Sequence, residues 1–382
     1  GTSTLCAFAL GEGKHDRAER IFSQTAAVIV VLSVLITIAV AIFAEPLAAL
    51  LGAGPQTIGY SAQYLHVVCL FSLCFILSYC LEVMVKVDGA PHLAMFGVGI
   101  SFLINVGLDY LFIMVWHWGV FGAALATGLA QLGSLLFFLR YFLSGKSNLR
   151  FRKFKPHLGE LKQIMPLGIA DCSIELMLGF LTLLYNHVIT KMLGESSLPI
   201  FAVIAYFSLM VSMIMQGIAQ GMMPLVSLAV GEGDREALKL YLRRTILSVL
   251  VVGALVEVVC QLCPDPIVSL LLSDGSALYA ETVASLRLYA LSYLPAGITI
   301  VLAGYFAALG KAGASALLSL GRGFVLLPAA VMALYLLGTG TMIWWAALIG
   351  EVLSLVLGVV LLRLNSPQND GSPERGAVSE AD

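Results

Sequence analysis

Three side chains that carry oxygen atoms occur close together within two apolar stretches of the sequence. Asn105 and Asp109 are four residues apart, which places both on one face of a helix, and Thr127 lies in the next apolar run. Amide, carboxylate and hydroxyl oxygens are the ligands that a small hard cation prefers. A carboxyl group in apolar surroundings also favours its protonated form, which suits proton coupling. The alternative is that these side chains only join helices through hydrogen bonds.

A second polar group follows the middle of the chain. Asp171 and Glu175 are four residues apart, and Thr182 and Asn186 continue the same helix face. Two carboxylates on one face repel each other, which favours binding of a proton or a cationic substrate between them. In the alternative interpretation, Asp171 is solvated near the end of its span and only Glu175 is buried.

A third set of polar residues predicts the edge of a substrate cavity. It recurs every four residues along an uncharged stretch: Ser208, Ser212, Gln216 and Gln220. Together with Asn186, these side chains would line a cavity, or they would form interhelical hydrogen bonds. Arg322 and Glu351 are charged residues within apolar runs. We expect them to make contacts between lobes or at the cytoplasmic ends of their spans.

The elements that must position these groups are membrane-spanning helices. Hydrophobic residues make up 59% of the 382 residues and charged residues 12%, and a membrane helix needs about 20 mostly apolar residues. Ten full spans are predicted, with residues 1–10 as part of an eleventh: 21–43, 61–85, 93–115, 119–140, 163–190, 198–229, 243–263, 282–309, 312–337 and 341–363. The fold class is therefore an all-α polytopic membrane protein.

Basic residues predict the orientation of these spans. All but two of the 21 lysines and arginines fall on one side, and the exceptions are Lys191 and Arg287. Loops rich in Lys and Arg face the cytoplasm. We therefore expect the loop around residues 146–162 and the polar tail 365–382 to be cytoplasmic, with the tail disordered.

The sequence contains an internal repeat. Gly-Glu-Gly occurs at 11–13 and again at 231–233, 220 residues later, and Glu45-Pro46 matches Asp265-Pro266 at the same offset. This predicts two parallel bundles of six helices: residues 1–145 form an N-terminal lobe, 146–162 an interlobe loop and 163–364 a C-terminal lobe. By this register we expect the first copy to begin about 60 residues before Gly1, so that this chain lacks one span and most of a second.

Several segments together resemble the multidrug and toxic compound extrusion (MATE) family of cation-coupled exporters. They are VDGAPHLAM at 87–95, LINVGLDYLFI at 103–113, GVFGAALAT at 119–127 and GIAQG at 217–221. The resemblance implies a V-shaped transporter with two lobes and antiport of organic cations against Na⁺ or H⁺. It also implies a first-lobe cation site that includes Asn105, Asp109 and Thr127. Glu175 matches a glutamate of a second-lobe site, but Ala307 and Ala308 stand where a partner acid is expected.

The predicted function is therefore export of drugs and organic cations across a bacterial inner membrane, driven by Na⁺ or H⁺, with no other cofactor. The expected partners are the lipid bilayer and small organic molecules, with no nucleic acid, and the protein is expected to be a monomer. The alternatives are a lipid-linked oligosaccharide flippase, a channel or a membrane-embedded enzyme. The flippase is disfavoured because only Arg287 and Arg322 lie within spans, and no HExxH or GxSxG motif supports an enzyme.

Overall fold

The computed structural model describes residues 1–50, 54, 57–154, 157–272, 276, 278–338 and 340–365, and within these ranges the regular structure is entirely helical. Most of the predicted C-terminal tail, from residue 366, lies outside the described residues. The chain divides into two compact units, Thr2–Glu160 and Leu161 onward, with Gly1 assigned to the second. Each unit is described by itself below.

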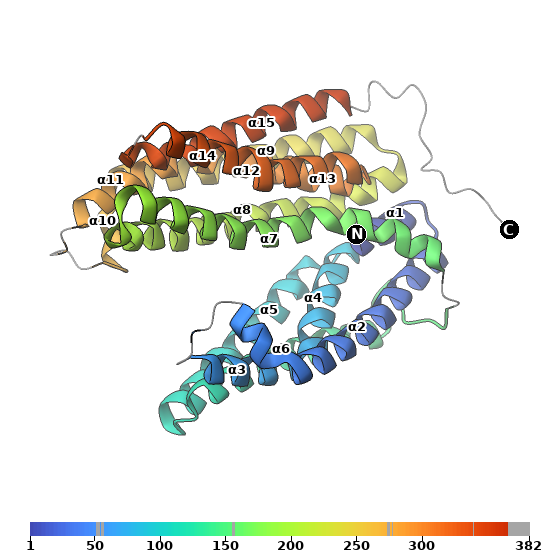
Figure 1. Ribbon diagram of the computed structural model, residues 1–382. Coiled ribbons are helices and arrows are strands. Elements are labelled where there is room, and N and C mark those ends of the chain that lie inside the picture. Colours follow the sequence, from blue (N-terminus) through green and yellow to red (C-terminus); the bar gives the residue numbers. More distant parts are fainter. Residues whose placement is uncertain are drawn as a thin grey trace. The chain divides into compact units, whose positions relative to one another are not determined.

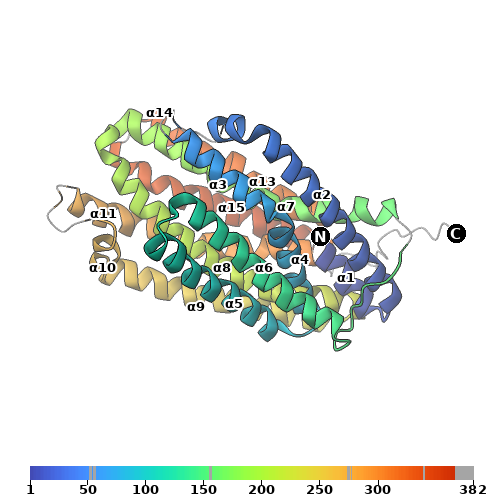
Figure 2. The same cartoon turned by 90° about the horizontal axis from the view of Figure 1, so that it is seen from below.

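The described part of the first unit contains six helices. They are α1 (Thr2–Gly11), α2 (His15–Leu50), α3 (Ile58–Leu70), α4 (Ser72–Val87), α5 (Pro91–Asp109) and α6 (Gly119–Leu143), and a π-helical segment, Tyr110–Val115, follows α5. α6 packs against α3, α4 and α5, and the close pairing of α5 with α6 is visible in Figure 2. This pairing brings Asn105 of α5 close to Thr127 of α6.

The second unit contains nine helices in its described ranges, and the first of them starts in the linking segment. They are α7 (Leu158–Leu193), α8 (Leu198–Glu232), α9 (Arg235–Leu262), α10 (Asp265–Ser269), α11 (Tyr279–Ala290), α12 (Tyr293–Ala308), α13 (Ala312–Leu320), α14 (Leu327–Leu336) and α15 (Trp345–Leu364). A π-helical segment, Gly321–Leu326, joins α13 to α14, and short 3₁₀ turns precede α8 and α15. In Figure 1, α12 runs beside α8, α9 and α15.

The length and apolar composition of these helices match the prediction of ten spans. Among the residues that the structure describes, eight helical segments are long and apolar enough to cross a membrane, and two bent pairs raise the number to ten when each pair counts as one span. The bends are 53° between α3 and α4 and 41° between α11 and α12. α7 begins at Leu158, so the last part of the predicted interlobe loop is helical.

The bends fall at matching places in the two units. α4 and α12 have the same length, and α12 begins 221 residues after α4 (293 − 72), so both bent pairs break at equivalent positions. α2 is kinked at Phe43, three residues before Pro46, and the helix in the matching region of the second unit is interrupted at Cys263, three residues before Pro266. A proline removes one backbone donor and crowds the preceding turn, which accounts for both breaks.

Candidate functional site

The first-lobe cluster forms where α5 and α6 face each other. The Asn105 amide nitrogen lies 3.5 Å from the Thr127 hydroxyl oxygen and donates to it, and that hydroxyl donates to the Ala123 carbonyl oxygen at 2.8 Å. The side chains of both residues are half-buried. The structure therefore brings together two of the three residues that the spacing singles out, and it joins two neighbouring spans through them.

Asp109 is the last residue of α5, directly before the π-helical segment. One of its carboxylate oxygens, Oδ1, is buried and has no hydrogen-bond partner among the described residues. A buried carboxylate oxygen without a donor is unfavourable by about 1–3 kcal/mol, and more when it is charged. A proton or a small cation would relieve this penalty.

A π-helical segment, Tyr110–Val115, begins directly after Asp109. An insertion of this kind changes the register of the backbone, and π-helical turns occur often at functional sites. Here it follows Asp109 and leads to the aromatic residues Trp116 and Trp118, whose ring centroids are 4.8 Å apart. His117 between them has a φ of 55°, an uncommon value for a residue that is not glycine. The chain thus turns sharply at His117, after the π-helical segment that follows Asp109.

The second unit encloses a cavity of about 380 Å³. Asn186, Ser208 and Ser212, three of the five residues predicted to line a substrate cavity, lie on its wall together with Thr182. Gln216 and Gln220, the other two, lie farther along α8 and are not among the residues that line it. The polar residues of α7 and α8 therefore do edge a cavity over part of their length.

Glu175 does not line this cavity, and it is exposed on α7. The side chain of Asp171 lies outside the described residues, so the predicted pairing of the two carboxylates stays a prediction. The alternative in which only Glu175 is buried is wrong in this structure, because Glu175 is exposed. Leu176 and Phe180 of the same helix are exposed as well.

Arg322 and Glu351 form a buried ion pair on the cavity wall. The Arg322 Nε lies 3.0 and 2.9 Å from the two Glu351 oxygens, and Nη2 lies 2.7 Å from Oε1. Residue exposure is 7% for Arg322 and 5% for Glu351. The expectation of a contact between lobes is therefore wrong for this pair: the two residues neutralise each other inside one unit, which satisfies each buried charge.

Aromatic side chains complete the cavity. Tyr185 stacks on Phe201 with a centroid distance of 5.1 Å, and Tyr293 shares a hydrogen bond with Ser208 at 2.9 Å. The Tyr185 hydroxyl is buried and has no partner within the described ranges. The residue pattern does not single out these tyrosines, because a tyrosine in an apolar span cannot be told from a core-packing residue until its neighbours are known.

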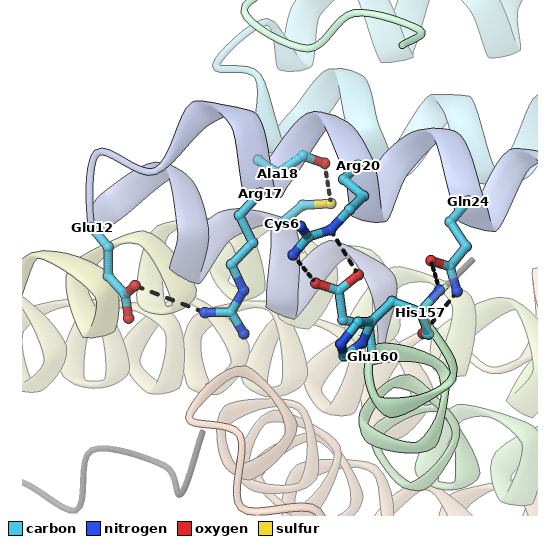
Figure 3. Close-up of polar contacts among 8 residues, drawn as sticks. All are labelled: Cys6, Glu12, Arg17, Ala18, Arg20, Gln24, His157 and Glu160. Carbon is cyan, nitrogen blue, oxygen red and sulfur yellow. Dashed lines mark hydrogen bonds and ion pairs between the residues drawn. The ribbon is translucent and has the colours of Figure 1, made fainter. Parts of the chain in front are cut away.

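A separate polar network fixes the segment that leads into α7, and Figure 3 shows most of it. Glu160 in the first turn of α7 accepts hydrogen bonds from Arg20 of α2, from Nη2 at 2.6 Å and from Nε at 3.4 Å. Gln24 of α2 and the backbone of His157 exchange two hydrogen bonds of 3.0 and 3.1 Å. Arg152 also pairs with Asp16. The end of the linking segment is thus tied to α2 within the first unit.

Comparison with known proteins identifies the relatives of this chain. The sequence model of the MatE family matches residues 1–111 and 172–332, which is more than half of the chain. Multidrug export protein MepA of Staphylococcus aureus (strain bovine RF122 / ET3-1) is 24% identical over 367 residues, covering 95% of this chain and 80% of its own.

Solved structures show the same fold. A crystal structure of MATE in complex with MaL6 aligns with a TM-score of 0.90 at 19% identity, and a structure of the MATE multidrug transporter DinF-BH aligns with a TM-score of 0.86 at 26% identity. Each alignment covers 95% of this chain and 82% of the other. This chain therefore belongs to the MatE family and is a multi-pass membrane transporter.

Proposed function

We propose that this transporter exports small organic cations, including drugs, in exchange for Na⁺ or H⁺ that enters through the first-lobe cluster. The observation that supports this most directly is the buried Asp109 oxygen without a partner in the described part of the chain, on the same helix as Asn105, which bonds to Thr127. A transporter needs a group whose binding energy for the coupling ion differs between two conformations. A carboxylate of this kind inside the span Pro91–Val115 meets that need.

The donor set of the cluster fits a proton or an alkali cation. Among the residues that the structure describes, no three His, Cys, Asp or Glu side chains gather into a group that could hold a metal ion. The cluster instead offers one carboxylate, one amide and one hydroxyl, which are hard oxygen donors. Because Asn105 is on α5 and Thr127 on α6, binding at Asp109 would change how these two spans pack.

The proposed substrates follow from the relatives. MepA is a multidrug export protein, and DinF-BH is a MATE multidrug transporter. The proposed setting is the inner membrane of a bacterium, with the basic loops in the cytoplasm and the protein acting as a monomer. A flippase for lipid-linked oligosaccharides is less well supported, because the charge of Arg322 is neutralised by Glu351 and adds no net positive charge to its cavity.

Efflux measurements test this proposal. Cells that express this protein are loaded with ethidium, and the loss of ethidium is followed by fluorescence with the Na⁺ or H⁺ gradient intact or collapsed. We expect efflux that stops when one of the two gradients collapses. Asp109→Asn keeps the size of the side chain but removes its charge, and we expect it to reduce coupled efflux at least about tenfold.

Glu175 supplies the comparison within the same measurement. Because its side chain is exposed on α7, Glu175→Gln separates a second-lobe coupling role from a first-lobe one. Loss of efflux in both variants, with normal amounts of folded protein in the membrane, would place carboxylates of both lobes in the transport cycle. Wild-type efflux in both variants would contradict the assignment of either carboxylate to coupling.

A further inference from the structure

The cavity of the second unit has an unusual balance of charge and hydrogen-bonding groups. Its only ion pair among the described lining residues, Arg322 with Glu351, is internally neutral. Both oxygens of Glu351 accept hydrogen bonds from Arg322, so the carboxylate is already satisfied. A cationic ligand would therefore gain little from Glu351 unless it first broke the pair.

The buried polar groups of the cavity wall that still lack a hydrogen-bond partner among the described residues are donors. Arg322 uses Nε and Nη2 for Glu351, and its third nitrogen, Nη1, makes no hydrogen bond within the described part of the chain. The Tyr185 hydroxyl is likewise buried and has no partner there. Arg322 and Tyr185 both line the cavity and are both more than nine-tenths buried. These two side chains, from the π-helical segment and from α7, are the donors that remain available to a ligand.

Charge decides which kind of acceptor fits. A ligand carboxylate would approach Arg322 but would leave one uncompensated negative charge beside Glu351, and an ammonium ion would leave one positive charge beside Arg322. Burying an unpaired charge is strongly unfavourable, whereas an uncharged carbonyl adds no charge and accepts the free donors. The cavity therefore suits a neutral ligand that carries a carbonyl group.

The walls favour an aromatic ligand. Tyr185 and Phe201 stack with an interplanar angle of 17°, and Tyr289 meets Tyr293 edge to face at 6.0 Å. All four residues line the cavity. Flat aromatic walls with a few polar groups are typical of pockets for small organic molecules, and aromatic rings pack well against them.

We propose that the second-lobe cavity is a binding site for uncharged aromatic carbonyl compounds, whose carbonyl oxygen is held by Arg322 and Tyr185. This ligand class differs from the organic cations of the proposed function. Glu351 then acts as a positioning residue: it orients the guanidinium and removes its net charge, so that the remaining N–H donors are available. The site lies wholly within the second unit and involves none of the three first-lobe residues.

Three naphthalene derivatives of similar size test the charge preference: 2-naphthamide, naphthalene-2-carboxylate and (naphthalen-2-yl)methylammonium. Equilibrium dialysis against the purified protein in nanodiscs, with empty nanodiscs subtracted, gives the dissociation constant of each. We expect 2-naphthamide to bind at least about tenfold more tightly than either charged analogue. Equal or tighter binding of a charged analogue would overturn the proposal.

Two variants locate the site. Tyr185→Phe removes only the hydroxyl, and Arg322→Lys keeps a positive charge for Glu351 but removes the forked donors. Each should weaken 2-naphthamide binding by about three- to tenfold and leave the weak binding of the charged analogues unchanged. Tyr305→Phe is the matched control, because Tyr305 is a buried tyrosine of the same unit that does not line the cavity.

If neither cavity variant changes 2-naphthamide binding, the proposal is wrong whatever the affinity of the wild-type protein. Thermal unfolding of each variant in detergent distinguishes loss of binding from loss of fold, and Tyr185→Phe keeps the test valid if Arg322→Lys does not fold. Binding is measured without an ion gradient. Its outcome is therefore independent of the ethidium efflux that tests the transport function.

Discussion

At the scale of single residues, apolar runs show which spans are consecutive, but they do not show which polar side chains of those spans meet. Asn105 and Thr127 meet as expected, because they lie on consecutive spans that a short turn holds antiparallel. The pair of Arg322 and Glu351 is separated by 29 positions and depends on how the π-helical segment packs against α15. These two residues also lie on consecutive spans, but the residue pattern does not show how the spans are rotated about their axes, so the pairing of the two charges is not predicted.

Thr127 provides a test of which ion drives transport. Thr127→Val keeps the shape of the side chain and removes the oxygen that Asn105 contacts. If Na⁺ is bound by the cluster, loss of one oxygen ligand should raise the Na⁺ concentration for half-maximal efflux about tenfold. If H⁺ is the coupling ion, the dependence on the proton gradient should stay close to wild type, because Asp109 retains its carboxyl group.

The control for this measurement is Thr245→Val on α9. Thr245 also donates its hydroxyl to a backbone carbonyl four residues earlier, Tyr241 at 2.8 Å, but it lies in the other unit. An equal shift in both variants would mean that the change acts through helix structure and that Thr127 is not an ion ligand.

The buried ion pair supports a prediction about stability. Arg322→Met leaves Glu351 buried without a partner, and we expect this to reduce the free energy of unfolding by about 3–5 kcal/mol. The double variant Arg322→Met/Glu351→Met leaves no buried charge, and it should recover most of that loss. Urea or thermal unfolding in detergent of the wild type, both single variants and the double variant gives the coupling energy. Additive losses would show that the two charges do not depend on each other.

At the scale of helices, the apolar runs predict where spans occur but not where they bend. The bent pairs α3/α4 and α11/α12 are each predicted as one span, because a predominantly apolar run continues across each bend. The π-helical segments are equally hidden, since they contain ordinary apolar residues apart from Arg322. Bends and π-helical turns arise from packing against neighbouring helices, and a single sequence gives no direct signal for that packing.

Close approach between α14 and α15 gives a prediction at this scale. Gly350 directly precedes Glu351, and a Cβ atom at this position would lie 2.6 Å from Leu327 Cδ2 and 2.9 Å from the Leu327 Cα. Because one of these atoms is backbone, the helices must separate. We expect Gly350→Ala to reduce the free energy of unfolding by about 1–3 kcal/mol, measured by thermal unfolding in detergent.

Gly217 is the matched control for Gly350. It lies inside α8, and a Cβ atom there would meet nothing within 4 Å. Gly217→Ala should therefore be neutral or stabilising by up to about 1 kcal/mol, because alanine favours the helix over the unfolded chain. If Gly350→Ala behaves like Gly217→Ala, then α14 and α15 do not pack as closely as the structure indicates.

At the scale of the whole molecule, the 220-residue repeat predicts two related units, and the matching bends agree with it. The chemistry of the two units differs. The first has a carboxylate at the end of α5 that is unpaired among the described residues, and the matching span of the second has Arg322 neutralised by Glu351. A duplicated scaffold thus carries two unlike sites. The residue pattern singles out the first, and it predicts Asn186, Ser208 and Ser212 of the second as cavity residues but gives Arg322 and Tyr185 no ligand role.

The segment that connects the two units is bonded to the first unit. Arg20 and Gln24 of α2 hold Glu160 and His157 at the start of α7, so the linking segment is bonded to the first unit until the residue before the boundary at Leu161. Glu160 is 4% exposed, whereas the Arg20 side chain is 42% exposed. Loss of this contact should free the segment without unfolding either unit.

Trypsin can measure that release, because Arg150, Arg152 and Lys153 lie in the segment. When the segment recloses faster than trypsin cuts it, the cleavage rate follows the population of the locally opened state. A partly exposed charged hydrogen bond contributes about 1 kcal/mol to keeping the segment closed. Glu160→Gln should therefore speed cleavage there about fivefold. The reversed pair Arg20→Glu/Glu160→Arg should slow it again, because the ion pair can re-form. Glu232→Gln, an exposed change at the end of α8, should have no effect. Unchanged cleavage in Glu160→Gln would mean that the segment is held by other contacts, such as that of Arg152 with Asp16.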